Sequence, residues 1–424
     1  MLFTYIIFAV LALVSHTVWA APPKAVFAHM IMGNSDLNDW LDDIQKAKDA
    51  HIDAFAMNIG VGSDQNLPSL QAAYQAANQI GGFGLFISFD YMANGAWDAG
   101  DVVNLLNTFK DEPSQFKVDG IPLVSTFEGA NNGGDWTWIK QQLDVYFVPC
   151  WSTLGAADVA LDSNVDGGFS WNAWPDGASD MESVFDKAYI EALGDKSYMM
   201  PVSPWFYTNL ASYEKNWVWR GDDLWFDRWQ QIIELQPAMV EIISWNDVGE
   251  SHHIGPIRSS GVPEGAWYVD GMDHEHFRDV LPYFIDQYKN GNSTAPTVDK
   301  EGITYYYRVT PADACSNGGT TGNDPAYQAT VDPNLVVQDN IYVDALVSSP
   351  AWVTVQIGNN PLLTLRAMHA GVNHFSVPFS GQTGNVTVGL YRDGTTLAQD
   401  TGLAITTDCP NGMTNYNAFA GGSF

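Results

Sequence analysis

One acidic segment of the chain follows directly on an apolar stretch. Residues 241–256 read EIISWNDVGESHHIGP, so Asp247 and Glu250 are three residues apart and His252 follows them. Two carboxyl groups at this spacing can divide acid–base work, because a protonated one donates a proton while an ionised one attacks or activates water. Cleavage of a glycosidic bond needs this division of roles. Asp247 and Glu250 are therefore the candidate catalytic residues.

The same residues also have plainer interpretations. Asp247 can cap a turn while Glu250 is merely solvated, and an arbitrary Asp-x-x-Glu pair usually does no more. His252 and His253 invite a metal site, but adjacent side chains on an extended chain point to opposite sides. The sequence also contains neither an HExxH motif nor a paired CxxC motif. We therefore expect no metal and no cofactor.

The segments that would have to position these carboxylates alternate along the chain between strand-like and helix-like stretches. The strand candidates lack polar alternation, as expected for parallel strands buried on both faces. They cover residues 25–33, 53–60, 84–91, 122–129, 145–151, 167–174, 197–206 and 239–247. Eight alternations predict a (β/α)8 TIM barrel, whose usual size is about 250 residues. We assign residues 21–296 to this catalytic barrel.

Apolar residues at helical spacing support the alternation. Trp225, Trp229 and Ile232 recur at intervals of three and four, which indicates one buried helix face. A fuller apolar face runs over residues 277–288, and Pro282 inside it predicts a kink.

The last part of the chain, residues 297–424, has a different texture. Short β-branched stretches with alternating polarity are separated by turns such as Asn-Asn and Asp-Gly, which predicts an antiparallel β-sandwich accessory domain. Cys315 and Cys409 bracket this region and are the expected disulfide, worth about 4 to 5 kcal/mol by loop closure. Cys150 ends an apolar strand and is expected to be a buried free thiol.

Carboxylates, tryptophans and other polar or aromatic residues gather at the ends of the predicted strands. Chemistry in such a barrel lies at the carboxyl ends of the strands, and the face of a Trp ring can cover the C–H side of a sugar. The candidate substrate-binding residues are His29, Asp90, Tyr91, Glu128, Trp151, Trp171, Asn172, Trp174, Trp205, Tyr207, Asn246 and His252.

The first residues and the overall charge limit where the protein works and what it binds. Residues 1–20 are apolar, too short to span a membrane, and end in small residues, which predicts a secretory signal peptide. The protein is then secreted, to the medium or the cell wall, and Asn292 and Asn385 become glycosylation acceptors. A net charge of −31 argues against nucleic acid or a membrane as partner. A neutral or insoluble partner remains compatible, and we expect a monomer.

Several long motifs, in order along the chain, resemble those of the fungal α-1,3-glucanases, or mutanases, of glycoside hydrolase family 71. The likeness covers residues 24–290 and extends less specifically into the β-rich tail. It implies a (β/α)8 domain packed on a C-terminal β-sandwich. It also implies a secreted, endo-acting, inverting hydrolase of insoluble, neutral α-1,3-glucan that needs no cofactor. The motifs are AVFAHMIMGN, FISFDY, LVSTFEG, YFVPCW, SPWFYTNL, WRGDDLWFDRW and SWNDVGESHHIGP.

The resemblance also suggests roles for single residues. The catalytic Asp and Glu of the family's WNDxGES motif fall on Asp247 and Glu250, and we assign Glu250 as general acid and Asp247 as general base. The family usually has Tyr where this chain has Val248 and His253. This departure leaves the carboxylates intact, but it puts stacking with the substrate and the preferred chain length in question.

Two other functions fit the same sequence. One is a glycan-binding cell-wall protein that keeps the barrel without its chemistry, and the other is a hydrolase of another glucan linkage. Turnover with a Glu250→Gln control and product analysis on several glucans separate them. The predicted β-sandwich, for its part, either binds glycan or serves to pack against the barrel.

Overall fold

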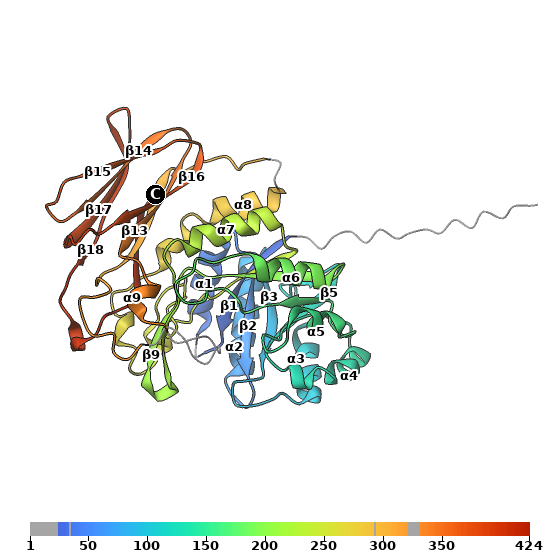
Figure 1. Cartoon of the computed structure of the whole chain (residues 1–424). Helices are drawn as coiled ribbons and strands as arrows, with labels where there is room; N and C mark the ends of the chain where they lie inside the picture. The colour runs from blue at the N-terminus through green and yellow to red at the C-terminus, as the bar shows by residue number, and fades with distance from the viewer. Residues whose placement is uncertain (1–23, 34, 292–293, 321–330) are drawn as a thin grey trace, which may run out of the picture.

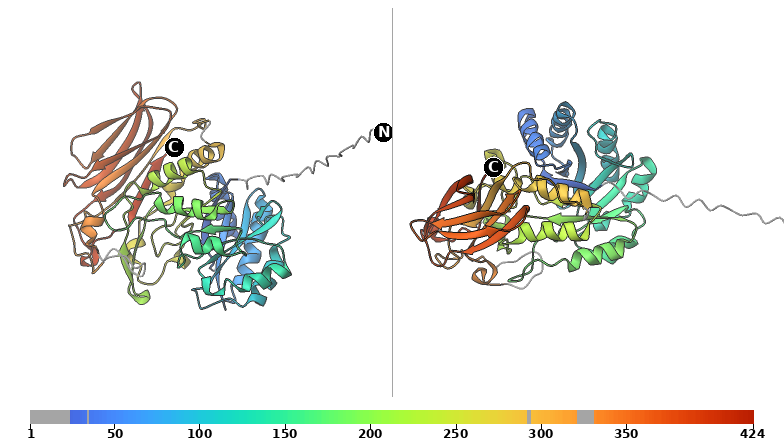
Figure 2. Two further views of the ribbon diagram at one scale, coloured as in Figure 1. Left: turned by 45° about the vertical axis from the view of Figure 1, so that its right-hand side comes forward. Right: turned by 90° about the horizontal axis from the view of Figure 1, so that it is seen from above.

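The computed structural model describes residues 24–33, 35–291, 294–320 and 331–424. The predicted signal peptide, residues 1–20, and the glycosylation acceptor Asn292 lie outside these residues. A barrel of strands and helices stands beside a region of antiparallel sheets, which is coloured orange to red in Figures 1 and 2.

Eight parallel strands close into a barrel, which confirms the predicted (β/α)8 architecture. Their order is β3-β2-β1-β11-β8-β7-β6-β5, and pairing of β3 with β5 completes the ring. The strands are β1 (Ala25–Ile31), β2 (Ala54–Gly60), β3 (Gly84–Asp90), β5 (Ile121–Phe127), β6 (Tyr146–Cys150), β7 (Gly167–Phe169), β8 (Ser197–Val202) and β11 (Met239–Ile242). Most end earlier than predicted, because the polar residues after them belong to the connecting loops.

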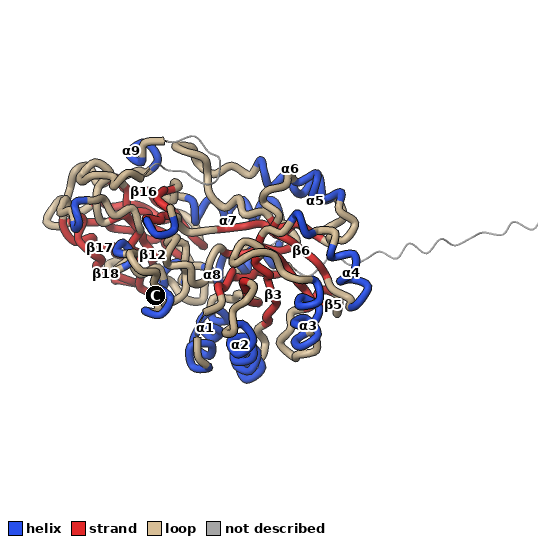
Figure 3. Tube along the Cα trace, turned by 90° about the horizontal axis from the view of Figure 1, so that it is seen from below, coloured by secondary structure: helices blue, strands red, loops and turns tan. Residues whose placement is uncertain are grey.

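Helices surround the barrel on the outside (Figure 3). They are α1 (Leu37–Asp49), α2 (Asn66–Ile80), α3 (Ala99–Phe109), α4 (Asp135–Gln142), α5 (Ala156–Leu161), α6 (Val184–Leu193), α7 (Leu224–Leu235) and α8 (Leu281–Asn290). Alternate strand residues such as Phe27, Phe86 and Met199 share a buried cluster inside the barrel. In the described part of the chain, no helix is long and apolar enough to cross a membrane.

The kink predicted at Pro282 is wrong. Pro282 lies in the first turn of α8, whose N-cap is Val280, and the residues before it form a separate 3-10 turn, Glu275–Arg278. A proline in the first turn lacks only an N–H that has no partner within the helix, so it starts the helix instead of bending it.

Two four-stranded antiparallel sheets form the C-terminal β-region, residues 302–424. Their orders are β16-β13-β12-β19 and β15-β14-β17-β18. The strands are β12 (Gly302–Arg308), β13 (Asn340–Val347), β14 (Ala351–Ile357), β15 (Leu363–Ala367), β16 (Gly371–Pro378), β17 (Gly384–Arg392), β18 (Thr395–Ile405) and β19 (Ala418–Ser423), with the short helix α9 (Pro333–Val336). Side chains of both sheets share one buried apolar cluster; the sandwich arrangement itself stays a prediction.

The cysteines behave as predicted. Cys315 and Cys409 form a disulfide within the C-terminal β-region, and Cys150 is a buried free cysteine. Asn385, the second glycosylation acceptor, is exposed on β17; its glycosylation stays a prediction.

The C-terminal β-region packs directly on the barrel. The indole N–H of Trp205 donates to the carbonyl of Tyr416 at 2.9 Å, and the N–H of Ala420 donates to the carbonyl of Asp273 at the same distance. The Tyr306 ring lies 4.8 Å from that of Phe277. These buried contacts make the two parts one packed unit.

A short hairpin interrupts the alternation between β8 and α7. Its strands are β9 (Tyr207–Leu210) and β10 (Lys215–Val218), paired antiparallel with Lys215 opposite Leu210. In Figure 1 the hairpin, labelled β9, projects downward beside the barrel, on the side of the C-terminal β-region.

Candidate active site

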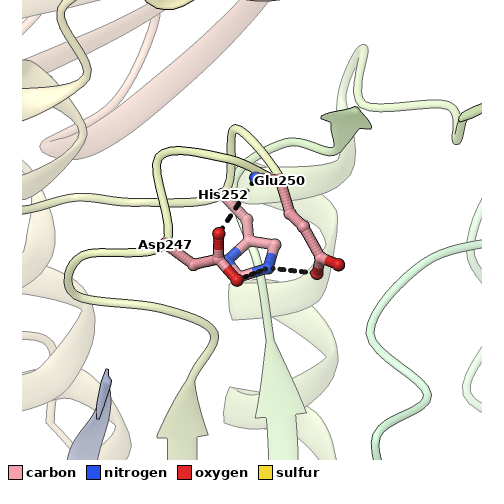
Figure 4. Close-up of side chains that lie close together, drawn as sticks. All are labelled: Asp247, Glu250 and His252. Carbon is pink, nitrogen blue, oxygen red and sulfur yellow. Dashed lines mark hydrogen bonds and ion pairs between the residues drawn. The ribbon is translucent and has the colours of Figure 1, made fainter. Parts of the chain in front are cut away.

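Asp247 and Glu250 lie on the loop that follows β11, the last strand of the barrel, and point toward the same space (Figure 4). The loop folds on itself because the backbone N–H of Asp247 donates to the Ser244 hydroxyl at 2.8 Å. The N–H of Glu250 donates to Oδ1 of Asp247 at 3.0 Å. Asp247 therefore does cap a turn, as its plainer interpretation predicted, but only one of its oxygens is used in this way.

His252 lies between the two carboxylates. Its Nε2 is 3.0 Å from Oε2 of Glu250 and 3.7 Å from Oδ2 of Asp247. Its Nδ1 is 2.9 Å from the Ser244 hydroxyl, so Ser244 orients both the histidine and the loop. The imidazole is buried, whereas the side chains of Asp247 and Glu250 are 21% and 15% exposed. The carboxylates are thus accessible to a substrate, and the histidine orients them from behind.

Lys215, at the start of β10, completes the group. Its ammonium lies 2.5 Å from Oε1 of Glu250, so the two oxygens of Glu250 face two different donors, Lys215 and His252. Among the residues that the structure describes, Asp247 has no such cation at hydrogen-bond distance. The site is therefore asymmetric.

This asymmetry sets the protonation of the two carboxyl groups apart. Burial, and then the neighbouring charge of Glu250, raise the pKa of Asp247 above its ordinary value. Burial acts in the same direction on Glu250, but the hydrogen bond from His252 and the charge of Lys215 outweigh it and lower the pKa of Glu250 to about 2. Of the two groups, Asp247 therefore keeps its proton to the higher pH, and Glu250 ionises first.

Asp247, Glu250 and His252 also have the spacing of a possible metal site. One ligand atom from each lies within 4.8 Å of the others. However, the Lys215 ammonium already occupies one oxygen of Glu250, and a divalent cation there would be repelled by it. His253 cannot contribute, because its ring is buried and stacked on that of His274 at 4.3 Å. These residues fit a proton-transfer site better than a metal site.

Further predicted residues line the barrel interior beneath the carboxylates. Nδ1 of His29 lies 2.8 Å from Oε1 of Glu241, and both side chains are buried. The ring of Trp171 meets that of His29 edge to face at 4.9 Å and is only half-buried, as is Asn172. Trp171 is therefore the predicted tryptophan best placed to touch a ligand.

Other predicted residues support the catalytic loop. Trp174 is buried, and its ring lies 5.5 Å from that of His252. The Asn246 amide bonds to both the N–H and the carbonyl of Ile31, at 2.9 and 2.8 Å, and so ties the loop to β1. The N–H of Tyr207 donates to the carbonyl of Glu250 at 3.0 Å. These three residues hold the loop in place.

The predicted residues at the ends of β3 and β5 form hydrogen bonds or pack within the loops near those strand ends. Asp90 accepts hydrogen bonds from the N–H groups of Met92 and Ala93, and Tyr91 is 7% exposed. Glu128 accepts from the Thr153 hydroxyl at 2.9 Å and from that of Ser152. We assign these residues a structural part in the present conformation.

Three of the predicted aromatic residues are enclosed. Trp151, Trp205 and Tyr207 are 1%, 1% and 0% exposed, so their rings offer no open face for a sugar. Sequence could not separate them from Trp171, because a Trp near a strand end can point to the helices, to the C-terminal β-region or to the mouth of the barrel.

Lys215 and Glu241 are functional candidates that the sequence analysis missed. Glu241 could have been found from the sequence, because it is a charged residue inside an otherwise apolar strand and its side chain points to the opposite face from that of Ile242. Lys215 carried none, because the hairpin that brings it to Glu250 separates the two by 35 positions.

A closed (β/α)8 barrel whose last strand leads to two neighbouring carboxyl groups of unequal pKa has the arrangement of a barrel glycoside hydrolase. Comparison with known proteins agrees. The chain belongs to glycosyl hydrolase family 71, whose sequence profile matches residues 22–424. This confirms the resemblance drawn from the motifs.

Similar proteins come from yeast and mould. The chain is 37% identical, over 94% of each chain, to the glucan endo-1,3-alpha-glucosidase agn1 of Schizosaccharomyces pombe. It is 34% identical to a mutanase of Penicillium rubens, over 94% of this chain and 88% of that one. It is 31% identical to the ascus wall endo-1,3-alpha-glucanase of Schizosaccharomyces pombe, over 85% of this chain and 87% of that one.

Proposed function

We propose that the protein is a secreted, endo-acting hydrolase of α-1,3-glucan that inverts the anomeric configuration. The observation that carries the proposal is the unequal pair of carboxyl groups, Asp247 and Glu250, on the loop after β11. The names of its relatives support the linkage. The substrate is an insoluble, neutral polysaccharide, for which the net charge of −31 is no obstacle.

The electrostatics of the site favour roles opposite to those that we assigned from the motif. Asp247, whose pKa is raised, is the general acid that protonates the departing glycosidic oxygen. Glu250, which Lys215 and His252 keep ionised, is the partner that accepts a proton from the attacking water. His252 faces both groups and fixes their orientation.

Inversion places a demand on the spacing of the pair. A water molecule between the carboxyl groups needs them about 6.5 to 9.5 Å apart, whereas retaining enzymes hold them about 5 to 5.5 Å apart. Here one oxygen of Asp247 and one of Glu250 lie within 4.8 Å. This distance joins one oxygen of each group and not the centres of the carboxyl groups, so inversion requires those centres to lie, or to move, about 6.5 Å or more apart when the glucan binds. Retention of configuration would follow if they did not.

The remaining parts of the proposal concern the setting of the enzyme. Export follows from the signal-like residues 1–20, and it places the protein where an insoluble wall glucan is found. A single chain carries every residue of the proposed site, so a monomer is sufficient for activity.

The test is release of reducing sugar from insoluble α-1,3-glucan, with α-1,4-glucan and β-1,3-glucan in parallel. We expect products from α-1,3-glucan alone. Glu250→Gln should lower turnover by about 10² to 10⁴-fold and keep polymer binding, while Glu264→Gln, the same change at an exposed position of the long loop, should leave both unchanged. Cleavage of another linkage would replace the substrate, and binding by the wild type without turnover would make the protein a glycan-binding one.

A further inference from the structure

A segment of the C-terminal β-region, residues 315–320, reaches the hairpin that carries Lys215. The segment is held at its start by the Cys315–Cys409 disulfide. Next to it, the N–H of Thr414 donates to the carbonyl of Ser316 at 2.7 Å. The disulfide and this hydrogen bond both lie within the C-terminal β-region, so the segment is attached to that region.

The segment and the hairpin meet at the side chain of Asn216, and the Thr320 side chain also hydrogen-bonds with that of Tyr207 on β9. Nδ2 of Asn216 donates to the carbonyl of Gly318 at 3.0 Å, and Oδ1 of Asn216 accepts from the Thr320 hydroxyl at 2.6 Å. Both ends of the amide are thus engaged by the segment, and Asn216 cannot turn without losing a hydrogen bond. Its neighbour in the chain is Lys215.

The hairpin needs support of this kind. Its two strands are four residues each, and an isolated two-stranded hairpin is at best marginally stable in water. Lys215 lies at the end of the ladder, in its last pair with Leu210, and its long side chain loses rotamer freedom when it is held still. A fixed backbone at Asn216 reduces the further cost of aiming the ammonium at Glu250.

We propose that Asn216 and Thr320 are positioning residues, through which the C-terminal β-region holds the β9–β10 hairpin so that Lys215 stays paired with Glu250. The C-terminal β-region is then a part of the active site and not only a packing partner. The importance of the pairing for turnover rests on the proposed function; the pairing itself does not.

Several groups besides Lys215 face Glu250 and must be considered. His252 and Asp247 lie on the same loop. Tyr268, from the 3-10 turn Trp267–Val269, donates its hydroxyl to the carbonyl of Gly249 at 2.6 Å. If Lys215 withdraws, His252 still donates to Glu250, while burial and the neighbouring Asp247 favour protonation. The pKa of Glu250 should then rise from about 2 toward the ordinary glutamate value of about 4.3.

The experiment is a titration of the Glu250 carboxyl by 13C NMR in the full-length secreted protein, with Glu250→Gln to assign the signal. The variants are Asn216→Ala and Thr320→Val, with Lys215→Met as the direct comparison. Ser376→Ala is the matched control, because it removes another hydrogen bond between the C-terminal β-region and the barrel, from Ser376 to Asp223.

We expect the midpoint of Glu250 to rise by about one pH unit or more in Lys215→Met, and by a smaller but measurable step in Asn216→Ala and Thr320→Val. Ser376→Ala should titrate as the wild type does. An unchanged midpoint in folded Asn216→Ala and Thr320→Val would overturn the proposal, as would an equal rise in Ser376→Ala. Since Thr320→Val is nearly isosteric, it keeps the test decisive if Asn216→Ala does not fold.

A pH–rate profile on α-1,3-glucan supplies a second readout. The acidic limb should move upward in the two positioning variants by the same step as the NMR midpoint. Failure of the wild type to cleave the glucan would count against the proposed function alone, because the titration requires no turnover.

Discussion

Two histidines of this protein each lie between a pair of aspartate or glutamate side chains, and the two arrangements differ in how many imidazole nitrogens the carboxylates use. At the mouth of the barrel, both Asp247 and Glu250 face the same nitrogen of His252, at 3.7 and 3.0 Å. Between the barrel and the C-terminal β-region, His374 uses both nitrogens. Its Nε2 lies 2.7 Å from Asp223, and its Nδ1 lies 2.7 Å from Asp344.

The His374 cluster is saturated and closed. The imidazole stacks on the ring of Phe226 at 4.5 Å, nearly parallel, and its side chain is 10% exposed. Burial alone would lower the pKa of His374, but Asp344 and Asp223 outweigh it and raise the pKa to about 9. The histidine is therefore a link that is charged at neutral pH, between the N-cap of α7 and the sheet of β13 and β16.

The His252 cluster is unsaturated and open. Its two carboxylates keep partial exposure, and Lys215 pairs with one of them only. At His374 each aspartate has its own imidazole nitrogen, and the cluster is a structural link. At His252 the two carboxylates face one nitrogen and only Glu250 has a second cation, Lys215, so the same residue types can form a proton-transfer site. The predictions below test whether this difference separates stability from chemistry.

The largest effect is expected at the carboxylates. Asp247→Asn and Glu250→Gln should each lower kcat/KM by about 10² to 10⁴-fold, which is the usual worth of a general acid or base, while thermal unfolding stays close to that of the wild type. Initial rates on α-1,3-glucan and calorimetry measure the two quantities. Full activity in either variant would remove it from the mechanism.

His374→Gln should have the opposite profile. Removal of one partner from a buried ion cluster costs about 3 to 5 kcal/mol, because Asp344 remains fully buried without its counter-charge. Urea unfolding should report this loss, and kcat of the folded fraction should stay within about twofold of the wild type. A stable protein with altered turnover would erase the distinction between the two clusters.

Alkaline pH should weaken the same link in the wild type. The folded pKa of His374, about 9, lies above the unfolded value of about 6.5. Its contribution is therefore complete below pH 6.5 and is lost as the pH rises through 9. The difference corresponds to about 3 kcal/mol. Urea unfolding at several pH values should show a wild-type decline over this window that His374→Gln lacks.

The smallest effect is expected at Trp171. Its half-exposed ring beside His29 should contribute about 0.5 to 1.5 kcal/mol of stacking to a bound sugar, so Trp171→Ala should raise KM several-fold with little change in kcat. The buried Trp151 serves as comparison, since Trp151→Phe should leave KM unchanged. An effect on KM from Trp151→Phe alone would reverse our assignment of these two rings.

The sequence predicted most of what depends on local pattern. Parallel strands buried on both faces leave unbroken apolar runs, so all eight barrel strands could be placed. The Asp247–Glu250–His252 group could be found because its members lie within six residues of one another. The positions where helices begin were harder to predict from the sequence, as Pro282 showed. A proline bends a helix when it lies in the interior, but it can also lie in the first turn without bending it.

Residue roles and burial that depend on contacts between distant parts of the chain could not be predicted from the sequence. The roles that we propose for Asp247 and Glu250 rest on Lys215, which is brought to the loop by a hairpin with no distinctive sequence. The same limit applies to His374, whose two aspartates lie 151 and 30 positions away. It applies also to Trp205 and Tyr207, which are covered by a region that follows them in the chain by about two hundred residues.

The most direct test of the account is an NMR time course of the secreted protein acting on α-1,3-glucan, which records the anomer released before mutarotation. Our account predicts that the β-anomer appears first, because Asp247 protonates the leaving oxygen while water assisted by Glu250 attacks from the opposite face. First appearance of the α-anomer would contradict it and would make one of the two carboxylates a nucleophile.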